Sequence, residues 1–134
     1  RMNNPQSLSG DPSKPLAGKT IVVDPGHGGG DTGAPGCGKT NEAMLNLDIS
    51  LHLRDKLTAL GANVLMTRSD DTTVSLEERM EFLNNANPDL AVAIHQNSIA
   101  ASANAQKVRG YLGLYSTEAG KLLAKSVSAS VASD

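Results

Sequence analysis

Four short apolar runs, each bounded by polar or turn-forming residues, predict strands, of which the first and the third are expected to be buried. The first covers residues 20–23 (Thr-Ile-Val-Val) and stops at residues 24–26 (Asp-Pro-Gly). The others cover residues 63–67, 90–94 and 110–115. Runs of this length, rich in β-branched residues and flanked by Gly, Pro, Asn or Asp, are typical of strands inside a sheet.

The segment after the first run shows apolar residues at helical spacing. We expect a helix from Thr40, whose side chain can cap it, to about Leu60, with Gly61 as its stop. One face of this helix carries five apolar residues: Leu45, Ile49, Leu53, Leu57 and Leu60. We expect that face to pack on the sheet.

Two further segments carry helix signals. Residues 75–78 (Ser-Leu-Glu-Glu) form a capping box that opens a helix to about Asn85, and the Asn-Pro pair at 87–88 ends it. Ser116 can cap a last helix that runs to the end of the chain. Because strands and helices alternate, the sequence predicts an α/β domain with a largely parallel central sheet and helices on both faces.

The chain has the length of one domain, at 134 residues. Residues 1–17 are rich in Asn, Pro, Gln, Ser and Gly with little apolar periodicity, which predicts a linker or disordered arm. The domain is expected to cover residues 18–134. Residues 26–38 are too rich in glycine for a helix or a strand interior and predict a loop in which the backbone approaches something closely.

Composition excludes several classes of partner. The 14 acidic and 12 basic residues give a net charge of −2 and are spread along the chain, so no basic stripe is available for nucleic acid. No apolar run reaches the roughly 18 residues of a membrane-spanning helix, so we expect no membrane insertion. Cys37 is the single cysteine of the sequence, so no internal disulfide can form.

Three potential metal ligands are expected at one edge of the predicted sheet, where the strands have their carboxyl ends and where α/β sheets bind ligands. His27 follows the first strand, Glu42 lies in the first turn of the returning helix, and His95 closes the third strand. Two imidazoles and a carboxylate can hold a catalytic zinc ion at roughly 2.0 to 2.2 Å per bond, with a fourth position open. The sequence therefore suggests a zinc site at this edge.

Each of these residues also has a purely structural interpretation. His27 could be an exposed loop histidine, Glu42 could interact favourably with the helix dipole by roughly 0.3 to 1 kcal/mol, and His95 could be a hydrogen-bonded strand end. Their spacing forms no short local zinc signature. The residues by themselves leave both interpretations open.

Several separated motifs resemble those of one enzyme family. They are residues 21–29 (Ile-Val-Val-Asp-Pro-Gly-His-Gly-Gly), a Glu soon afterwards, Arg68, the Leu76-x-x-Arg79 pair and residues 93–97 (Ala-Ile-His-Gln-Asn). In this order, from about Lys19 to the C-terminus, they resemble the zinc-dependent N-acetylmuramoyl-L-alanine amidases of the type 3 family. Agreement of several motifs is more specific than Gly-His-Gly alone.

The resemblance implies roles for individual residues. Three of them would be the ligands of one zinc ion and form the catalytic site: His27, Glu42 and His95. Asp24 and Asn97 would support these ligands from a second layer. His52, on the first predicted helix, is not a ligand in this family and is expected to be structural.

The activity implied by the resemblance is hydrolysis of the amide bond between the lactyl group of N-acetylmuramic acid and L-alanine in peptidoglycan. It places the protein at the cell wall, extracellular or periplasmic, as an autolysin-type hydrolase. In this family the general base is a Glu in a Pro-x-x-Leu-x-Glu strand, whereas this sequence reaches Asp134 without that motif. We therefore expect a domain truncated at its C-terminus that by itself hydrolyses slowly or not at all. Comparable turnover by this chain and a longer one would contradict that expectation and mean that a residue of this sequence, most plausibly Asp31, acts as the base.

Two other functions fit parts of the sequence. Residues 33–40 match the nucleotide-binding pattern G-x-x-x-x-G-K-[ST], but they lie too far from the first strand, and no later strand ends in the Asp needed for magnesium. A nucleotide-binding protein is therefore the minor alternative. A non-catalytic domain that binds zinc and peptidoglycan is the principal alternative, since the expected general base is missing from the sequence.

Overall fold

The computed structural model describes residues 10–98, 104, 107 and 110–133. These residues belong to two compact units, divided after Ser98. Among the described residues, no helix combines the length and the apolar character needed to cross a membrane. The three predicted metal ligands all lie in the first unit.

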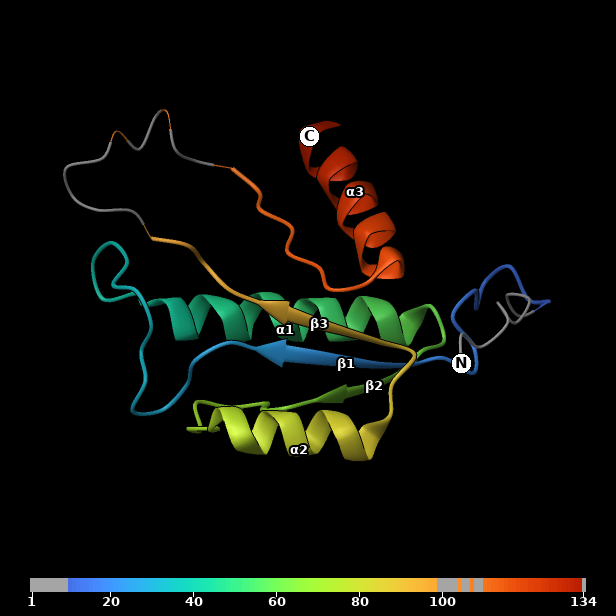
Figure 1. Ribbon diagram of the computed structural model, residues 1–134, viewed down its shortest axis with the longest axis horizontal. Helices are drawn as coiled ribbons and strands as arrows, with labels where there is room; N and C mark the ends of the chain where they lie inside the picture. Colours follow the sequence, from blue (N-terminus) through green and yellow to red (C-terminus); the bar gives the residue numbers. More distant parts are fainter. Residues whose placement is uncertain (1–9, 99–103, 105–106, 108–109, 134) are drawn as a thin grey trace. The chain divides into compact units, whose positions relative to one another are not determined.

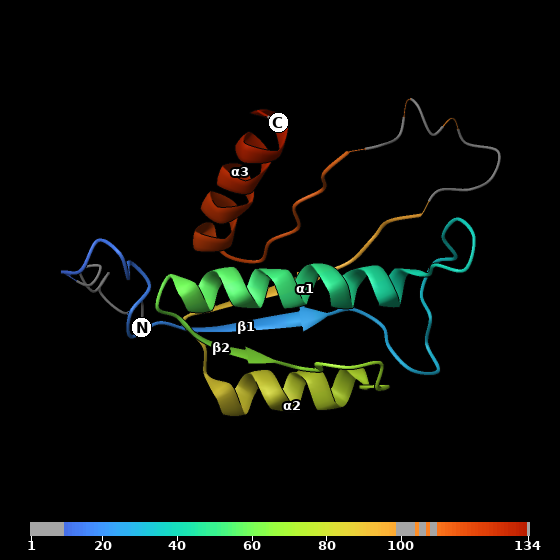
Figure 2. The same cartoon turned by 180° about the vertical axis from the view of Figure 1, so that it is seen from behind.

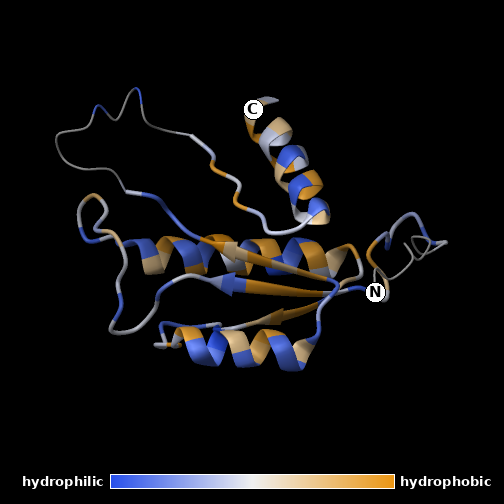
Figure 3. Cartoon of the chain, in the orientation of Figure 1, coloured by the Kyte–Doolittle hydropathy of each residue, from blue (hydrophilic) through white to orange (hydrophobic). Residues whose placement is uncertain are grey.

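The first unit is built on a parallel three-stranded sheet in the order β2-β1-β3. The strands are β1 (Thr20–Pro25), β2 (Asn63–Met66) and β3 (Leu90–Ile94), and their carboxyl ends meet at one edge (Figure 1). In Figure 3 the strands are largely hydrophobic, apart from the hydrophilic carboxyl end of β1. The first three predicted strands and the parallel sheet are therefore confirmed, and β1 is buried as expected. The predicted burial of β3 is wrong, because β3 lies at an edge of this sheet and its residues alternate between half-buried and exposed.

Helices cover both faces of the sheet. The helix α1 (Glu42–Ala59) lies on one face, because β3 passes in front of it in Figure 1 and behind it in Figure 2. Ile21 and Val23 point toward this helix and form the buried core. The helix α2 (Leu76–Ala86) lies on the other face, where Arg79 pairs with Asp24 of β1. The predicted α/β class, with helices on both faces, is confirmed.

The buried stripe of α1 differs from the predicted apolar face. Leu53 and Leu57 pack against the core as expected. Leu45 and Ile49 are instead 41% and 43% exposed, and the buried residues of this helix are Glu42, Ala43, Asn46 and Ser50. The reason is that the first turns of α1 face the loop after β1, where the side chains of Glu42 and Asn46 find hydrogen-bond partners, and apolar periodicity cannot reveal such a contact.

Both ends of α2 match their sequence signals. Ser75 accepts a hydrogen bond from the Glu78 backbone, and the Glu78 carboxylate accepts one from the Ser75 backbone, so the capping box is complete. Asn87 ends the helix with a φ of 40°, and Pro88 follows. This helix is therefore defined by local chemistry at both termini.

Two predicted caps are wrong by one residue. Asn41, and not Thr40, caps α1, because its side chain accepts a hydrogen bond from the Met44 backbone at 2.9 Å. The last helix, α3 (Glu118–Ser133), has Thr117 at its start, where the Thr117 hydroxyl accepts a hydrogen bond from the Gly120 backbone at 3.0 Å. In both places two neighbouring residues have capping side chains, and the path of the preceding loop decides between them.

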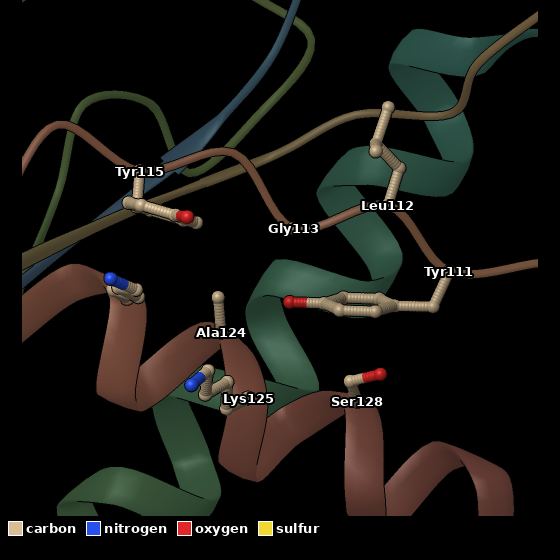
Figure 4. A pocket seen from close by; sticks show the side chains of 8 residues that line it. Tyr111, Leu112, Gly113, Tyr115, Ala124, Lys125 and Ser128 are labelled. Atoms are coloured by element: carbon tan, nitrogen blue, oxygen red, sulfur yellow. The ribbon is translucent and has the colours of Figure 1, made fainter.

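The predicted strand at residues 110–115 is wrong. This segment is irregular, because it makes no ladder of backbone hydrogen bonds with any strand in the described part of the chain. Tyr111 and Tyr115 instead line a pocket of about 230 Å³, together with Ala124, Lys125 and Ser128 of α3 (Figure 4). An apolar run becomes a strand only when a neighbouring strand pairs with it.

Part of the predicted N-terminal arm is attached to the first unit. The described residues 10–17 form turns, and residues 1–9 lie outside the described part. The Leu16 backbone N–H donates to the Leu60 carbonyl at 3.0 Å, and the Leu16 side chain packs against the core. Packing of the first unit therefore extends to residues before Gly18.

Candidate metal centre

Three elements bring His27, Glu42 and His95 to the carboxyl edge of the sheet. His27 lies two residues after the end of β1, Glu42 is the first residue of α1, and His95 directly follows β3. The loop between β1 and α1 is tied to the start of the helix, because the Glu42 N–H donates to the Ala34 carbonyl at 2.9 Å. The convergence predicted from the strand order is therefore present.

The side chains of these residues meet at one carboxylate oxygen. His27 Nε2 lies 3.2 Å from Glu42 Oε1, and His95 Nδ1 lies 3.1 Å from the same oxygen. The two imidazole rings stand edge to face, with centroids 5.0 Å apart and an angle of 81° between their planes. One ligand atom from each residue lies within 4.8 Å of the other two.

These separations fit a metal ion held between the three groups. Two zinc–ligand bonds of about 2.1 Å at a tetrahedral angle place their donor atoms roughly 3.4 Å apart. The observed contacts of 3.1 and 3.2 Å are close to that value. Two imidazoles and one carboxylate are also the donor set of several catalytic zinc sites. Geometry and donor chemistry therefore both suit zinc.

Glu42 is anionic because the protein supplies hydrogen-bond donors to its buried carboxylate. Its Oε2 accepts from the Ala34 N–H and its Oε1 from the Gln96 N–H, both at 2.9 Å. Burial by itself would raise the pKa, but these amides, together with His95 and His27, lower the pKa of Glu42 to about 2. The carboxylate is therefore charged at neutral pH and available to a cation.

His27 is oriented by Asp31, a contact that the sequence did not indicate. The Asp31 carboxylate lies 2.8 Å from His27 Nδ1, and this hydrogen bond lowers the pKa of Asp31, as does the Gly33 N–H. A carboxylate only accepts, so Nδ1 carries a proton, and in a neutral ring the lone pair of Nε2 faces Glu42. A cation between Nε2 and the Glu42 carboxylate would stabilise that arrangement.

Close approach at the site requires glycine at two positions. A Cβ at Gly26 would lie 2.2 Å from the His95 ring, and one at Gly33 would lie 2.7 Å from the His27 ring and 2.8 Å from Glu42. Gly33 also has a φ of 63°. His27 itself has a φ of 61°, which costs about 1 to 3 kcal/mol in a non-glycine residue, and such strain clusters at functional sites.

Comparison with known proteins assigns the family. The family model described as N-acetylmuramoyl-L-alanine amidase matches residues 21–134. The chain belongs to this family. The predicted family resemblance is thus confirmed.

Two relatives of known sequence resemble this chain over part of their length. YqiI of Bacillus subtilis, an uncharacterized protein, is 47% identical over 69% of this chain and 44% of its own length. The N-acetylmuramoyl-L-alanine amidase LytC of Bacillus subtilis is 38% identical over 90% of this chain and 24% of its own length. The chain therefore spans less than half of either relative.

The fold also matches a solved structure of the family. The catalytic domain of CwlV, an N-acetylmuramoyl-L-alanine amidase from Bacillus (Paenibacillus) polymyxa var. colistinus, superposes with a TM-score of 0.60 at 38% sequence identity. The match covers 64% of this chain and 49% of that one. An α/β amidase fold is therefore shared, and not only a set of sequence motifs.

Asn46 links two sides of the site. Its side-chain amide donates to the Gly26 carbonyl at 3.2 Å, and its side-chain oxygen accepts from the Gln96 side chain at 3.4 Å. It is fully buried on α1. Sequence reasoning missed Asn46 because it placed Leu45 on the buried face. The available signal was that Asn46 lies four positions after Glu42, which places both on the same side of the helix.

The two predicted supporting residues do not contact the imidazoles. The Asp24 carboxylate accepts hydrogen bonds from Thr67 and Arg79. Asn97 is exposed, and among the described residues no hydrogen bond of its side chain is seen. His52 lies outside the site, as predicted, but is 77% exposed and contacts its own helix. Asp31, and not Asp24, is the aspartate that hydrogen-bonds to the His27 ring.

The nucleotide-binding pattern does not form a phosphate loop in this chain. In such a loop the Lys and the Ser or Thr open the helix that follows the strand. Here Lys39 is exposed and Thr40 donates to the Cys37 carbonyl, while α1 begins only at Glu42. The match follows from the glycine content of the loop, and the nucleotide-binding alternative is not supported.

Proposed function

We propose that this chain provides the zinc centre of a peptidoglycan hydrolase, with one zinc ion held by His27, Glu42 and His95. The observation that carries the proposal is the convergence of both imidazoles on one Glu42 oxygen, at 3.2 and 3.1 Å. A buried carboxylate with a pKa of about 2 is an anion that a divalent cation can neutralise. Membership of the amidase family supports the same assignment.

Within this centre, each residue of the chain has a distinct task. A bound zinc ion would acidify water and polarise the carbonyl of the bond to be cleaved. Glu42 supplies the negative charge, and Asp31 fixes the ring orientation of His27. The amides of Ala34 and Gln96 hold the carboxylate of Glu42 in place, so that it need not reorganise when a cation binds.

The reaction we propose is cleavage of the amide bond between the lactyl group of N-acetylmuramic acid and L-alanine in peptidoglycan. The family and the similarity to LytC and to the CwlV catalytic domain support this choice of bond. Since peptidoglycan lies outside the cytoplasm, we further propose that the protein acts there, at the cell wall. The substrate contacts would form around the carboxyl edge of the sheet.

Zinc binding is tested on the 134-residue chain by elemental analysis after mild chelation. The wild-type chain should retain one zinc ion. His95→Ala and Glu42→Gln should both lose it, because removal of one of three protein ligands sharply weakens a site. His52→Ala is the matched control, since this histidine is exposed and outside the site, and it should retain zinc. Full zinc in His95→Ala would show that His95 is not a ligand.

Catalysis is tested in the whole protein with purified cell walls. The expected product is a new free amino group on L-alanine, detected by labelling and mass spectrometry of the released peptides. Glu42→Gln should abolish this product while His52→Ala should not. A whole protein that binds zinc and peptidoglycan but releases no alanine amino group would contradict the hydrolase and support a non-catalytic binding domain.

A further inference from the structure

Two buried arginines lie beneath the metal centre on elements that contribute no ligand. Arg68 follows β2 and is 4% exposed, while Arg79 lies on α2 and is 7% exposed. Burial of a guanidinium group is unfavourable unless its donors are paired. The partners of these two side chains therefore indicate what they do.

Arg79 binds the segment that carries His27. Its guanidinium donates to the His27 carbonyl at 2.8 Å and to the Pro25 carbonyl at 2.9 Å, and it forms an ion pair with Asp24. A further bond to the Val74 carbonyl, at 3.1 Å, anchors the same side chain at the start of α2. Arg79 thus fixes the backbone on both sides of Gly26 and holds His27 in its left-handed conformation.

Arg68 joins the same loop to the start of α1. Its donors reach the carbonyls of Pro25, Gly26 and Ala43, each at 2.9 Å. Ala43 is the neighbour of Glu42, so one guanidinium ties the His27 loop to the helix end that presents the carboxylate. A fourth bond, to the Asp70 carbonyl at 2.9 Å, anchors Arg68 in the connection between β2 and α2.

The connection between β2 and α2 also holds the turn after His27. Asp71 accepts a hydrogen bond from the Gly29 backbone, and Thr73 accepts one from the Gly30 backbone, both at 2.9 Å. This turn ends at Asp31, which orients the His27 ring. The segment of residues 25–31, which carries His27, is therefore held by Arg68 and Arg79 through its carbonyls and by Asp71 and Thr73 through its backbone N–H groups.

We propose that Arg68 and Arg79 are positioning residues of the metal centre, which set the geometry of His27 and Glu42 by binding the backbone that carries them. The proposal rests on the proposed zinc site. It adds that the segment from Arg68 to Arg79, which supplies no ligand, determines how tightly and with what geometry the metal is bound.

The planar fork of arginine is essential to this role. A guanidinium presents five N–H donors in a fixed plane, whereas the lysine ammonium has three donors on one atom. In Arg79 different nitrogens serve the His27 and Val74 carbonyls, so lysine could keep the positive charge near Asp24 but could not maintain all these bonds. Arg79→Lys therefore separates charge from geometry.

The test compares Arg79→Lys with wild type and with Arg54→Lys, each as the 134-residue chain. Arg54 lies on α1 and pairs with Asp55, away from the site, which makes it a matched control. Zinc affinity is measured by competition with a chromophoric chelator, and site geometry by the visible absorption of the Co²⁺-loaded protein. Circular dichroism of each metal-free protein checks the fold.

We expect Arg79→Lys to bind zinc roughly ten- to hundredfold more weakly, with a changed Co²⁺ spectrum, and Arg54→Lys to match wild type. A folded Arg79→Lys with wild-type affinity and spectrum would overturn the proposal. If Arg79→Lys does not fold, Asp71→Ala is tested in its place. Weaker zinc binding by Asp71→Ala would support the proposed positioning role of this segment, and unchanged binding would overturn it. Failure of the wild-type chain to bind zinc would instead contradict the proposed function.

Discussion

At the scale of single residues, the proposed metal centre depends on one carboxylate with several partners. Glu42 Oε1 is approached by His27, by His95 and by the Gln96 amide, while Oε2 is held by Ala34. A glutamate that served only the helix dipole would need none of these contacts. The Glu42 carboxylate is therefore a fixed negative charge that a cation can neutralise.

Substitution of Gly33 should damage the site more than an equivalent substitution elsewhere in the same loop. Gly33→Ala forces a Cβ within 2.8 Å of both His27 and Glu42, at a φ of 63°. Gly38→Ala is the control, because its φ of 68° gives the same backbone penalty but its Cβ meets no atom within 4 Å. We expect zinc affinity to fall at least about tenfold in Gly33→Ala only.

Isothermal titration with zinc, after confirmation that both proteins fold, distinguishes the two variants. Equal affinities for Gly33→Ala and Gly38→Ala would mean that the loop relaxes around the added methyl group. In that case the tight approach of Gly33 to His27 would not be needed for metal binding.

At the scale of elements, α2 matters because it carries Arg79. Ser75→Ala removes the side-chain acceptor for the Glu78 backbone and should lower the free energy of unfolding by about 1 kcal/mol. Ser69→Ala, at an exposed position of the preceding connection, is the control and should change stability little. Urea denaturation measures both, and equal stability of the two variants would mean that the cap does not stabilise α2.

A carboxylate joins the starts of β1 and β3 and should make stability depend on pH. Asp89 accepts hydrogen bonds from the Thr20 N–H at 2.8 Å and from Lys19 at 3.2 Å, which lower the pKa of Asp89 below its ordinary value of 3.8. A lowered pKa means that the carboxylate stabilises the fold fully above pH 3.8, and that this effect is lost as the pH falls through the folded-state pKa.

Asp89→Asn should therefore be less stable than wild type near neutral pH, and the difference should shrink below pH 3.8. Denaturation at a series of pH values measures it. Glu81→Gln, a change at an exposed carboxylate of α2, is the control and should show no comparable trend. A difference between Asp89→Asn and wild type that stays constant down to strongly acidic pH would contradict this role of Asp89.

At the scale of the whole molecule, the proposed metal centre belongs to the first compact unit. His27, Glu42 and His95, and the arginines beneath them, all lie before the division after Ser98. A chain that ends at Ser98 should therefore bind zinc with the affinity of the 134-residue chain. It should also gain thermal stability on zinc addition, because binding to the folded state stabilises it by mass action.

Titration calorimetry and thermal unfolding, with and without zinc, test this prediction on both chains. The full chain serves as the reference for both measurements. Loss of zinc binding in the shorter chain, if it stays folded, would mean that residues after Ser98 contribute to the centre.

The sequence by itself determined the elements whose signals are local. Three strands, the capping box of α2 and the alternation of strands and helices were readable, because each depends on neighbouring residues. The order of the elements also placed His27, Glu42 and His95 at the same sheet edge. Whether they bind zinc stays a proposal.

Only the tertiary structure decided which polar side chains support that edge. Arg79 and the His27 carbonyl are separated by 52 residues, and Asn46 and Gln96 by 50, so no local pattern relates them. The same reason explains the failure at residues 110–115, where strand formation depends on a partner strand. Apolar periodicity reports burial along one element, whereas the supports of this site are hydrogen bonds between elements distant in the chain.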